Sequence, residues 1–153
     1  LMAKADILDK IIKDLQEYLA ITNQVYNEST SKIDAYDAKI IKKRIEEKAI
    51  RKRGIKNLEL YKNIQDDFNL GKGEAETIVL CLENKISLIT DDKKAMKACK
   101  ILRIKFTTVP NLLIRLYNKG LMTKIEADLY LKRLEKFGRY SNNILQKIKE
   151  DLK

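Results

Sequence analysis

The sequence has few of the residues that interrupt, cross-link or anchor a chain. Of its 153 residues, only five are glycine and one is proline, which leaves little room for linkers or disordered segments. The longest uninterrupted apolar run, residues 78–82, is far too short to span a bilayer, and the acidic, lysine-containing start lacks the apolar segment of a signal peptide. We therefore expect a single cytoplasmic domain over residues 1–153, without membrane contact, that buries roughly two thirds of its unfolded surface.

Cysteine is scarce and histidine is absent. The two cysteines, Cys81 and Cys99, lie in apolar helical patterns without CxxC spacing, so neither a disulfide framework nor a zinc site is expected. We interpret both as reduced core residues. Without histidine, a cluster of acidic side chains has no imidazole to balance its charge.

Positive charge is abundant, and it is concentrated in one segment. The chain has a formal net charge of +10, and residues 39–56 alone contain nine basic and two acidic residues. A basic stripe suits a polyanion, because neutralising phosphates releases condensed counterions. A solvated helix face explains the same pattern equally well. The residues expected to contact nucleic acid are Lys42, Lys43, Arg44, Arg51, Lys52 and Arg53.

Hydrophobic periodicity predicts helices that alternate with short strands. Such alternation implies parallel pairing, right-handed crossovers and an α/β sheet covered on both faces. Asn23 is expected to cap the second helix, and residues 55–61 are ambiguous. The predicted helices cover residues 7–15, 23–28, 31–54, 73–84, 92–102, 111–118, 123–137 and 141–152, and the predicted strands cover residues 18–22, 86–90 and 106–109.

Acidic residues follow two of the predicted strands and begin the helix between them. The carboxyl ends of parallel strands meet at one edge of a sheet, and the helix that starts near residue 73 returns to that edge. Separate pieces of the sequence are therefore expected to deliver carboxylates to one place. These acids are Glu28, Glu74, Glu76, Asp91 and Asp92.

Clustered carboxylates repel one another unless a cation lies among them. A hard divalent metal is the natural partner, because Mg²⁺ takes oxygen ligands and binds one or two carboxylates together with waters and substrate phosphates. Two such ions can activate water and stabilise the leaving oxygen of a phosphodiester. The acids therefore favour metal-dependent hydrolysis of a nucleic acid held by the basic stripe.

Two choices among the acids stay open. Glu74 and Glu76 lie about 200° apart around a helix, so only one can point into a small site, and Glu74 is preferred because it shares a face with Ile78. Of the adjacent Asp91 and Asp92, the second is preferred. Each acid also has a structural explanation: Asp92 can be a helix cap, and Glu74 can lie at the positive end of a helix.

Three stretches of sequence resemble one known family. The segment GKGEAETIVLCLENKISLITDDKKAMKACKILRI resembles the second half of PIN-domain proteins, and it is most similar to a prokaryotic branch related to VapC toxins. YLAITNQVYNES resembles the family's strand and V..E helix, and YNKGLMTKIEADLYLKRLEKFGRYS resembles the tail of that branch. The resemblance covers nearly the whole chain.

The resemblance implies a three-layer α/β/α fold with a short parallel sheet and a helical tail over about residues 111–153. It also implies a ribonuclease that uses Mg²⁺ or Mn²⁺, with Glu28 as the second acid, Glu74 as the third, and Asp91 or Asp92 as the fourth. Toxin members pair with an antitoxin, and homodimers are usual. The family's first strand and its Asp would lie a few residues before Leu1, so we expect the chain printed above to begin after that strand.

Two other functions compete with this hypothesis. A PIN-like fold without the first Asp could serve as a catalytically incomplete module that binds nucleic acid or protein. A mainly helical basic protein could instead bind DNA, although no helix-turn-helix signature supports this.

Overall fold

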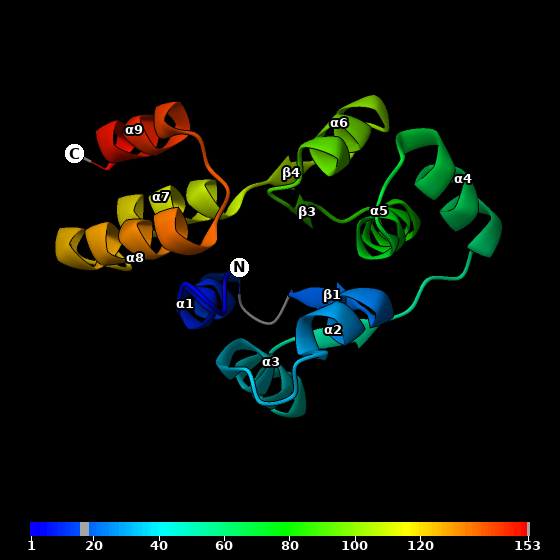
Figure 1. Cartoon of the computed structure of the whole chain (residues 1–153), viewed down its shortest axis with the longest axis horizontal. Coiled ribbons are helices and arrows are strands. Elements are labelled where there is room, and N and C mark those ends of the chain that lie inside the picture. The colour runs from blue at the N-terminus through cyan, green and yellow to red at the C-terminus, as the bar shows by residue number, and fades with distance from the viewer. Residues whose placement is uncertain (16–18, 153) are drawn as a thin grey trace. The chain divides into compact units, whose positions relative to one another are not determined.

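The computed structural model describes residues 1–15 and 19–152, and in these ranges the chain forms nine helices and four short strands (Figure 1). The predicted mixed α/β class is confirmed, with parallel strand pairing. Backbone contacts divide the described residues into two compact units. The central unit comprises residues 19–108, and the terminal unit comprises residues 1–15 and 109–152.

The strands of the central unit form two parallel pairs. β1 (Ala20–Thr22) pairs with β2 (Arg51–Arg53), and β3 (Leu88–Ile89) pairs with β4 (Phe106–Thr107). Among the described residues these pairs belong to separate two-stranded sheets. We expected the carboxyl ends of β1 and β3 to lie at one edge of a single sheet. This expectation is wrong, because β1 and β3 belong to different sheets. The sequence indicates strands but not which strands pair.

The basic stripe is not one helix, as predicted, but a helix followed by a strand. α3 (Tyr36–Glu46) ends where Lys48 adopts a left-handed backbone with φ of 59°, and β2 follows. The Arg51 N–H donates to the Leu19 carbonyl at 2.9 Å, which begins the pairing with β1. Pairing with a neighbouring strand thus overrides the helical propensity of the lysine- and arginine-rich segment.

The cap of the helix after β1 lies one residue earlier than expected. Thr22, the last extended residue, is the cap of α2 (Asn23–Thr30), and its hydroxyl accepts from the Val25 N–H at 3.3 Å. The prediction of Asn23 as the cap is therefore wrong. Thr22 is fully buried, so its hydroxyl needs this partner.

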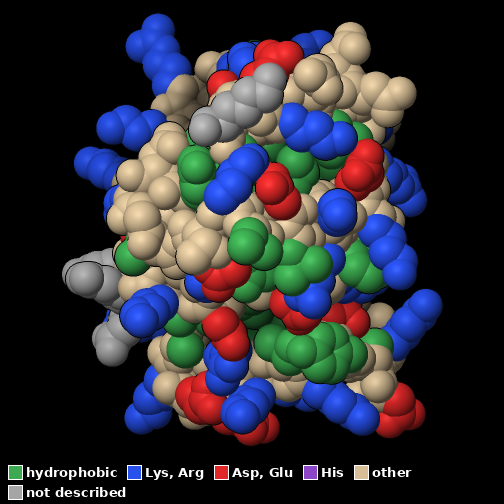
Figure 2. All heavy atoms as spheres, turned by 90° about the vertical axis from the view of Figure 1, so that its left-hand side faces the viewer, with side chains coloured by type: hydrophobic (Ala, Val, Ile, Leu, Met, Phe, Trp, Pro, Cys, Tyr) green, Lys and Arg blue, Asp and Glu red, His purple; other side chains and the backbone are tan. Residues whose placement is uncertain are grey.

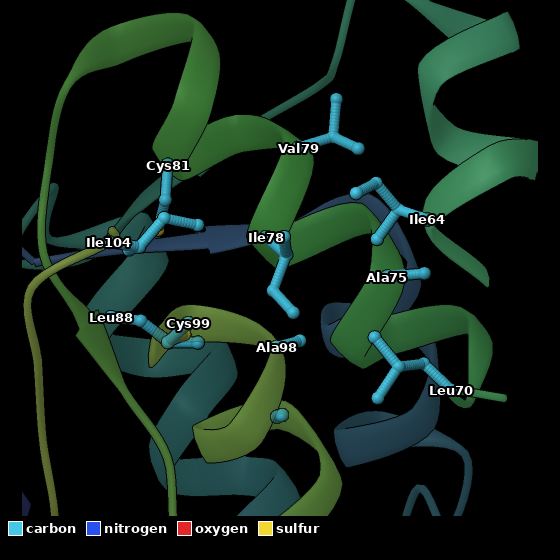
Figure 3. Packing of buried hydrophobic residues seen from close by; sticks show 11 residues of the cluster. Ile64, Leu70, Ala75, Ile78, Val79, Cys81, Leu88, Ala98, Cys99 and Ile104 are labelled. Atoms are coloured by element: carbon cyan, nitrogen blue, oxygen red, sulfur yellow. The ribbon is translucent and has the colours of Figure 1, made fainter. Parts of the chain in front are cut away.

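Three helices build the core of the central unit. The ambiguous segment resolves into α4 (Leu58–Phe68), which is followed by α5 (Lys72–Asn84) and α6 (Lys93–Ile101). α5 is buried as predicted, and it contacts α2, α4, α6 and β1. Figure 3 shows Val79 of α5 facing Ile64 of α4, and Ile78 pointing toward Ala98 of α6. The first turn of α5 lies beside α2, because Gly73 is next to the Glu28 carboxylate.

Both cysteines lie inside this core, as predicted. Cys81 and Cys99 are free and buried (Figure 3). Burial raises the pKa of Cys81 to about 12, with a further contribution from Cys99, and burial also raises the pKa of Cys99. At neutral pH both thiols are therefore protonated apolar groups.

The terminal unit is helical, as expected for the tail. It contains α1 (Leu8–Leu15), α7 (Val109–Asn118), α8 (Lys124–Phe137) and α9 (Asn142–Asp151). Thr123 and Glu126 form a capping box at the start of α8. Asp14 joins α1 to α7 through Arg115 Nε at 2.8 Å and Lys119 Nζ at 2.6 Å. In the part of the chain that the structure describes, no helix has both the length and the apolar character to cross a membrane.

Candidate functional site

Two of the predicted acids, Glu28 of α2 and Glu76 of α5, meet at a common neighbour, Gln24. The Gln24 backbone N–H donates to Glu76 Oε2 at 2.7 Å, and its side-chain Nε2 donates to Glu28 Oε1 at 3.1 Å. Gln24 lies in the first turn of α2, just beyond the carboxyl end of β1. These two carboxylates therefore meet Gln24 just beyond the carboxyl end of β1.

Tyr61 of α4 lies within electrostatic range of the same two carboxylates. Burial raises the pKa of the Tyr61 phenol, and the negative charges of Glu76 and then Glu28 raise it further. Its ring packs against the core of the central unit. Three helices thus contribute to one small polar site, which we call the carboxylate pair: Glu28 and Glu76, with Gln24 and Tyr61 beside them.

Gly73 in the first turn of α5 makes room for Glu28. A Cβ added to this buried glycine would lie 2.6 Å from Glu28 Oε2, which is closer than real Cβ contacts allow. The Glu28 carboxylate therefore occupies the space that any other residue at position 73 would need. In the sequence alone, this glycine indicates only a break between elements.

Glu74 does not share this position. Its carboxylate turns back toward Gly71, the residue that precedes α5, where an acid interacts favourably with the positive helix end. Glu74 and Glu76 do point apart, as the helical spacing requires. However, Glu76 is the one that shares the neighbour Gln24 with Glu28.

Asp92 caps α6. Its Oδ1 accepts from the Ala95 N–H at 2.8 Å, and its own N–H donates to Thr90 Oγ1 at 3.1 Å. This is the structural alternative considered for Asp92. Asp91, two residues beyond the end of β3, is half-buried.

The carboxylate pair fits a hard divalent cation in the type and number of its donors. Mg²⁺ in proteins takes one or two carboxylates and completes its shell with waters and substrate phosphates. A larger cluster is not assembled: among residues 1–15 and 19–152, no three His, Cys, Asp or Glu side chains form a group that could hold a metal ion. The structure thus brings together two of the expected acids.

The basic residues of β2 line an open groove. Arg51, Lys52 and Arg53 are all exposed, and with Lys48, Ile45 and Ile50 they surround a depression of about 480 Å³. Lys52 Nζ lies 4.7 Å from the centre of the Tyr26 ring on α2, a cation–π contact. This groove offers both positive charge and apolar surface.

The three basic residues predicted on α3 differ from those on β2. Arg44 pairs with Glu47 at 2.6 Å, and Lys43 approaches the same carboxylate at 3.9 Å, whereas Lys42 is half-buried. On the face drawn in Figure 2, basic side chains are spread among acidic and apolar ones. β2 therefore carries the most accessible part of the predicted stripe.

Sequence reasoning missed two neighbours of the carboxylate pair. Gln24 lies four residues before Glu28, a spacing that places both on one helix face, and this signal could have identified it. Tyr61 lies at the end of a segment whose structure the sequence left ambiguous. Nothing local connects it to acids that are 15 or more residues away in the sequence.

Comparison with known proteins gives one match. The model of the family DUF3368, described as a PIN domain, matches residues 1–153. No curated protein and no solved structure matches the chain.

Proposed function

Because the chain belongs to the PIN-domain family, whose members are generally nucleases that use divalent metals, we propose that it is a metal-dependent endoribonuclease. The observation that carries this proposal is the carboxylate pair at the carboxyl end of β1. Acids from α2 and α5 come together there, although they lie 48 positions apart in the sequence.

In this proposal Glu28 and Glu76 hold Mg²⁺ or Mn²⁺ through their carboxylate oxygens. The bound cation supplies water activation and stabilisation of the leaving oxygen. The protein's own part is to fix the two carboxylates and to keep the scissile phosphate near them. Glu74, Asp91 and Asp92 remain proposed as further acidic residues of the site, and Asp92 would have to exchange its capping bond for that role.

The basic strand is the proposed RNA-binding surface. Thr22 and Arg53 are register partners, so the last residue of β2 lies at the same end of this strand pair as the start of α2. Cations there can bind the phosphates on either side of the cleaved bond. Lys42, Lys43 and Arg44 of α3 extend this surface in the proposal.

The finer assignment rests on the resemblance of the GEAE and DD segments to the VapC-related branch. From it we propose that the protein is the toxin of a toxin–antitoxin pair and that it forms a homodimer. Co-purification with the product of an adjacent reading frame would support the first part, and sedimentation analysis would test the second.

The test of the enzymatic proposal is cleavage of end-labelled RNA with Mn²⁺ or Mg²⁺. Glu28→Gln and Glu76→Gln should each lower kcat/KM by about 100-fold or more, because each removes a charged metal ligand. Glu59→Gln, a change of an exposed glutamate on α4, is the matched control and should be neutral. Cleavage that persists in EDTA, or equal activity of all three variants, would contradict the proposal.

One observation favours a second function, namely a module that binds RNA without cutting it. A group of three or more acids able to hold a metal is absent from the described ranges. In that case, binding without cleavage should occur at every Mn²⁺ concentration. The plot of log binding constant against log salt concentration should then become less steep by about 2 when glutamine replaces Arg51, Lys52 and Arg53. Each phosphate that the protein no longer neutralises lowers the slope by about 0.7.

A further inference from the structure

Gln24 connects the two acids of the carboxylate pair, and it does so through two different groups. Its backbone N–H holds Glu76 at 2.7 Å, while its side-chain amide holds Glu28 at 3.1 Å. One residue therefore fixes a carboxylate from its own helix relative to a carboxylate from α5. We propose that Gln24 is a positioning residue that sets the separation of Glu28 and Glu76 for a divalent cation. This proposal rests on the proposed nuclease function.

An ordinary helix-surface pair does not account for this arrangement. A side chain that bonds another four residues later is common on helices and stabilises them by a few tenths of a kcal/mol. Such a pair has no need of a partner on another helix. At Gln24, however, the backbone N–H of the same residue donates to the Glu76 carboxylate at the positive end of α2.

Glu28 is restrained on its other side as well. Its Oε2 lies against Gly73, where a Cβ would come within 2.6 Å. The Gln24 amide and the Gly73 backbone thus limit the carboxylate from two directions. Metal ligands are typically oriented in this way by hydrogen bonds from neighbouring groups.

The chemistry of an amide suits this role. Gln24 donates hydrogen bonds without adding charge, so the pair keeps the negative charge that attracts a cation. A lysine at this position would neutralise the pair, and a glutamate would repel Glu28. A neutral side-chain donor therefore holds Glu28 near the carboxylate that the Gln24 backbone holds, without competing with the metal.

The test uses Gln24→Met, which keeps the length of the side chain and removes its donors. The backbone N–H to Glu76 is unchanged, so the substitution removes only the restraint on Glu28. Gln65→Met is the matched control, because Gln65 is a half-buried glutamine on α4 of the same unit. Two quantities are measured on the full chain: the Mn²⁺ dissociation constant by electron paramagnetic resonance, and the carbon-13 carboxyl resonance of Glu28 without metal.

We expect Gln24→Met to weaken Mn²⁺ binding about tenfold or more and to shift the Glu28 resonance, whereas Gln65→Met changes neither. An unchanged Glu28 resonance would overturn the role of Gln24, and so would an unchanged affinity beside a shifted resonance when the wild-type protein does bind Mn²⁺. If the wild-type protein bound no Mn²⁺ while the resonance still shifted, the metal-dependent function would be wrong and Gln24 would still position Glu28.

Discussion

Neighbouring residues of the GEAE segment have different environments, because each step along a helix turns a side chain by about 100°. Gly73 gives space to Glu28, Glu74 turns toward Gly71, and Glu76 reaches the backbone of Gln24. A substitution at Gly73 therefore affects the Glu28 carboxylate, whereas a substitution at Gly71, two residues earlier, affects the Glu74 carboxylate.

Replacing Gly71 or Gly73 should separate the contributions of Glu28 and Glu74. Gly73→Ala should displace the Glu28 carboxylate and lower RNA cleavage about tenfold or more, while a helical Gly→Ala change itself favours stability by about 0.5–1 kcal/mol. Gly71→Ala should displace Glu74 instead and lower cleavage by a smaller factor than Gly73→Ala does. Cleavage rates and urea unfolding of both variants provide the measurement; a larger loss of cleavage in Gly71→Ala would assign the site to Glu74.

The sequence predicted part of the candidate site, and the limits of that prediction have physical causes. Glu28 was identified because it follows a strand, and the capping of Asp92 was foreseen as an alternative because aspartate before a helix commonly accepts an N–H. The choice of Glu74 over Glu76 depended on which face of α5 meets which neighbour. In the structure α2 lies against this helix, a long-range contact that no local pattern reveals.

Among the elements, those with strong local signals were predicted well. α5 and α8 begin and end close to the predicted residues, because glycines precede the apolar run of α5, and a capping box and a glycine bound α8. β2 was missed because three consecutive cations resemble a helix surface. Its pairing with β1 depends on residues about 30 positions earlier.

Asp14 should stabilise the contact between α1 and α7 in a pH-dependent manner. The Lys119 hydrogen bond holds the pKa of Asp14 below its ordinary value of 3.8 despite burial, and Arg115 assists. Because the folded pKa is lowered, this stabilisation is present above about pH 3.8 and is lost as the pH falls through the folded pKa.

Asp14→Asn should therefore reduce the free energy of unfolding by about 1–2 kcal/mol at pH 7, and the difference should shrink toward pH 2. The control is Asp128→Asn, because Asp128 pairs with Lys124 at 2.9 Å and both side chains are about half exposed. That change should stay within about 0.5 kcal/mol. Urea unfolding at pH 7 and at low pH tests both, and equal losses would refute the special role of Asp14.

In the molecule as a whole, the two cysteines report on one of the two compact units. Both lie in the central unit, and a Cys81 pKa of about 12 leaves almost no thiolate at pH 8. Labelling by a thiol reagent should therefore need opening of the central core and be at least about 1,000-fold slower in native buffer than in 8 M urea.

The same labelling tests the prediction that residues 1–153 form a single domain. If residues 1–153 unfold cooperatively, the urea midpoint from thiol labelling will coincide with the midpoint from far-ultraviolet circular dichroism, which reports on both units. Separate midpoints would show that the units unfold independently. Rapid labelling in native buffer would contradict the burial of Cys81 and Cys99.

The exposed strand β2 also affects how copies of the protein behave in concentrated solution. An open strand edge is a template for intermolecular β-pairing, the first step of many fibrils. If two copies paired through β2, each copy would bring three positive charges to the contact, from Arg51, Lys52 and Arg53. Electrostatic repulsion therefore keeps the β2 strands of two copies apart. A bound polyanion would cancel that repulsion, so the protein should be most prone to precipitate at low ionic strength, when nucleic acid just neutralises its charge.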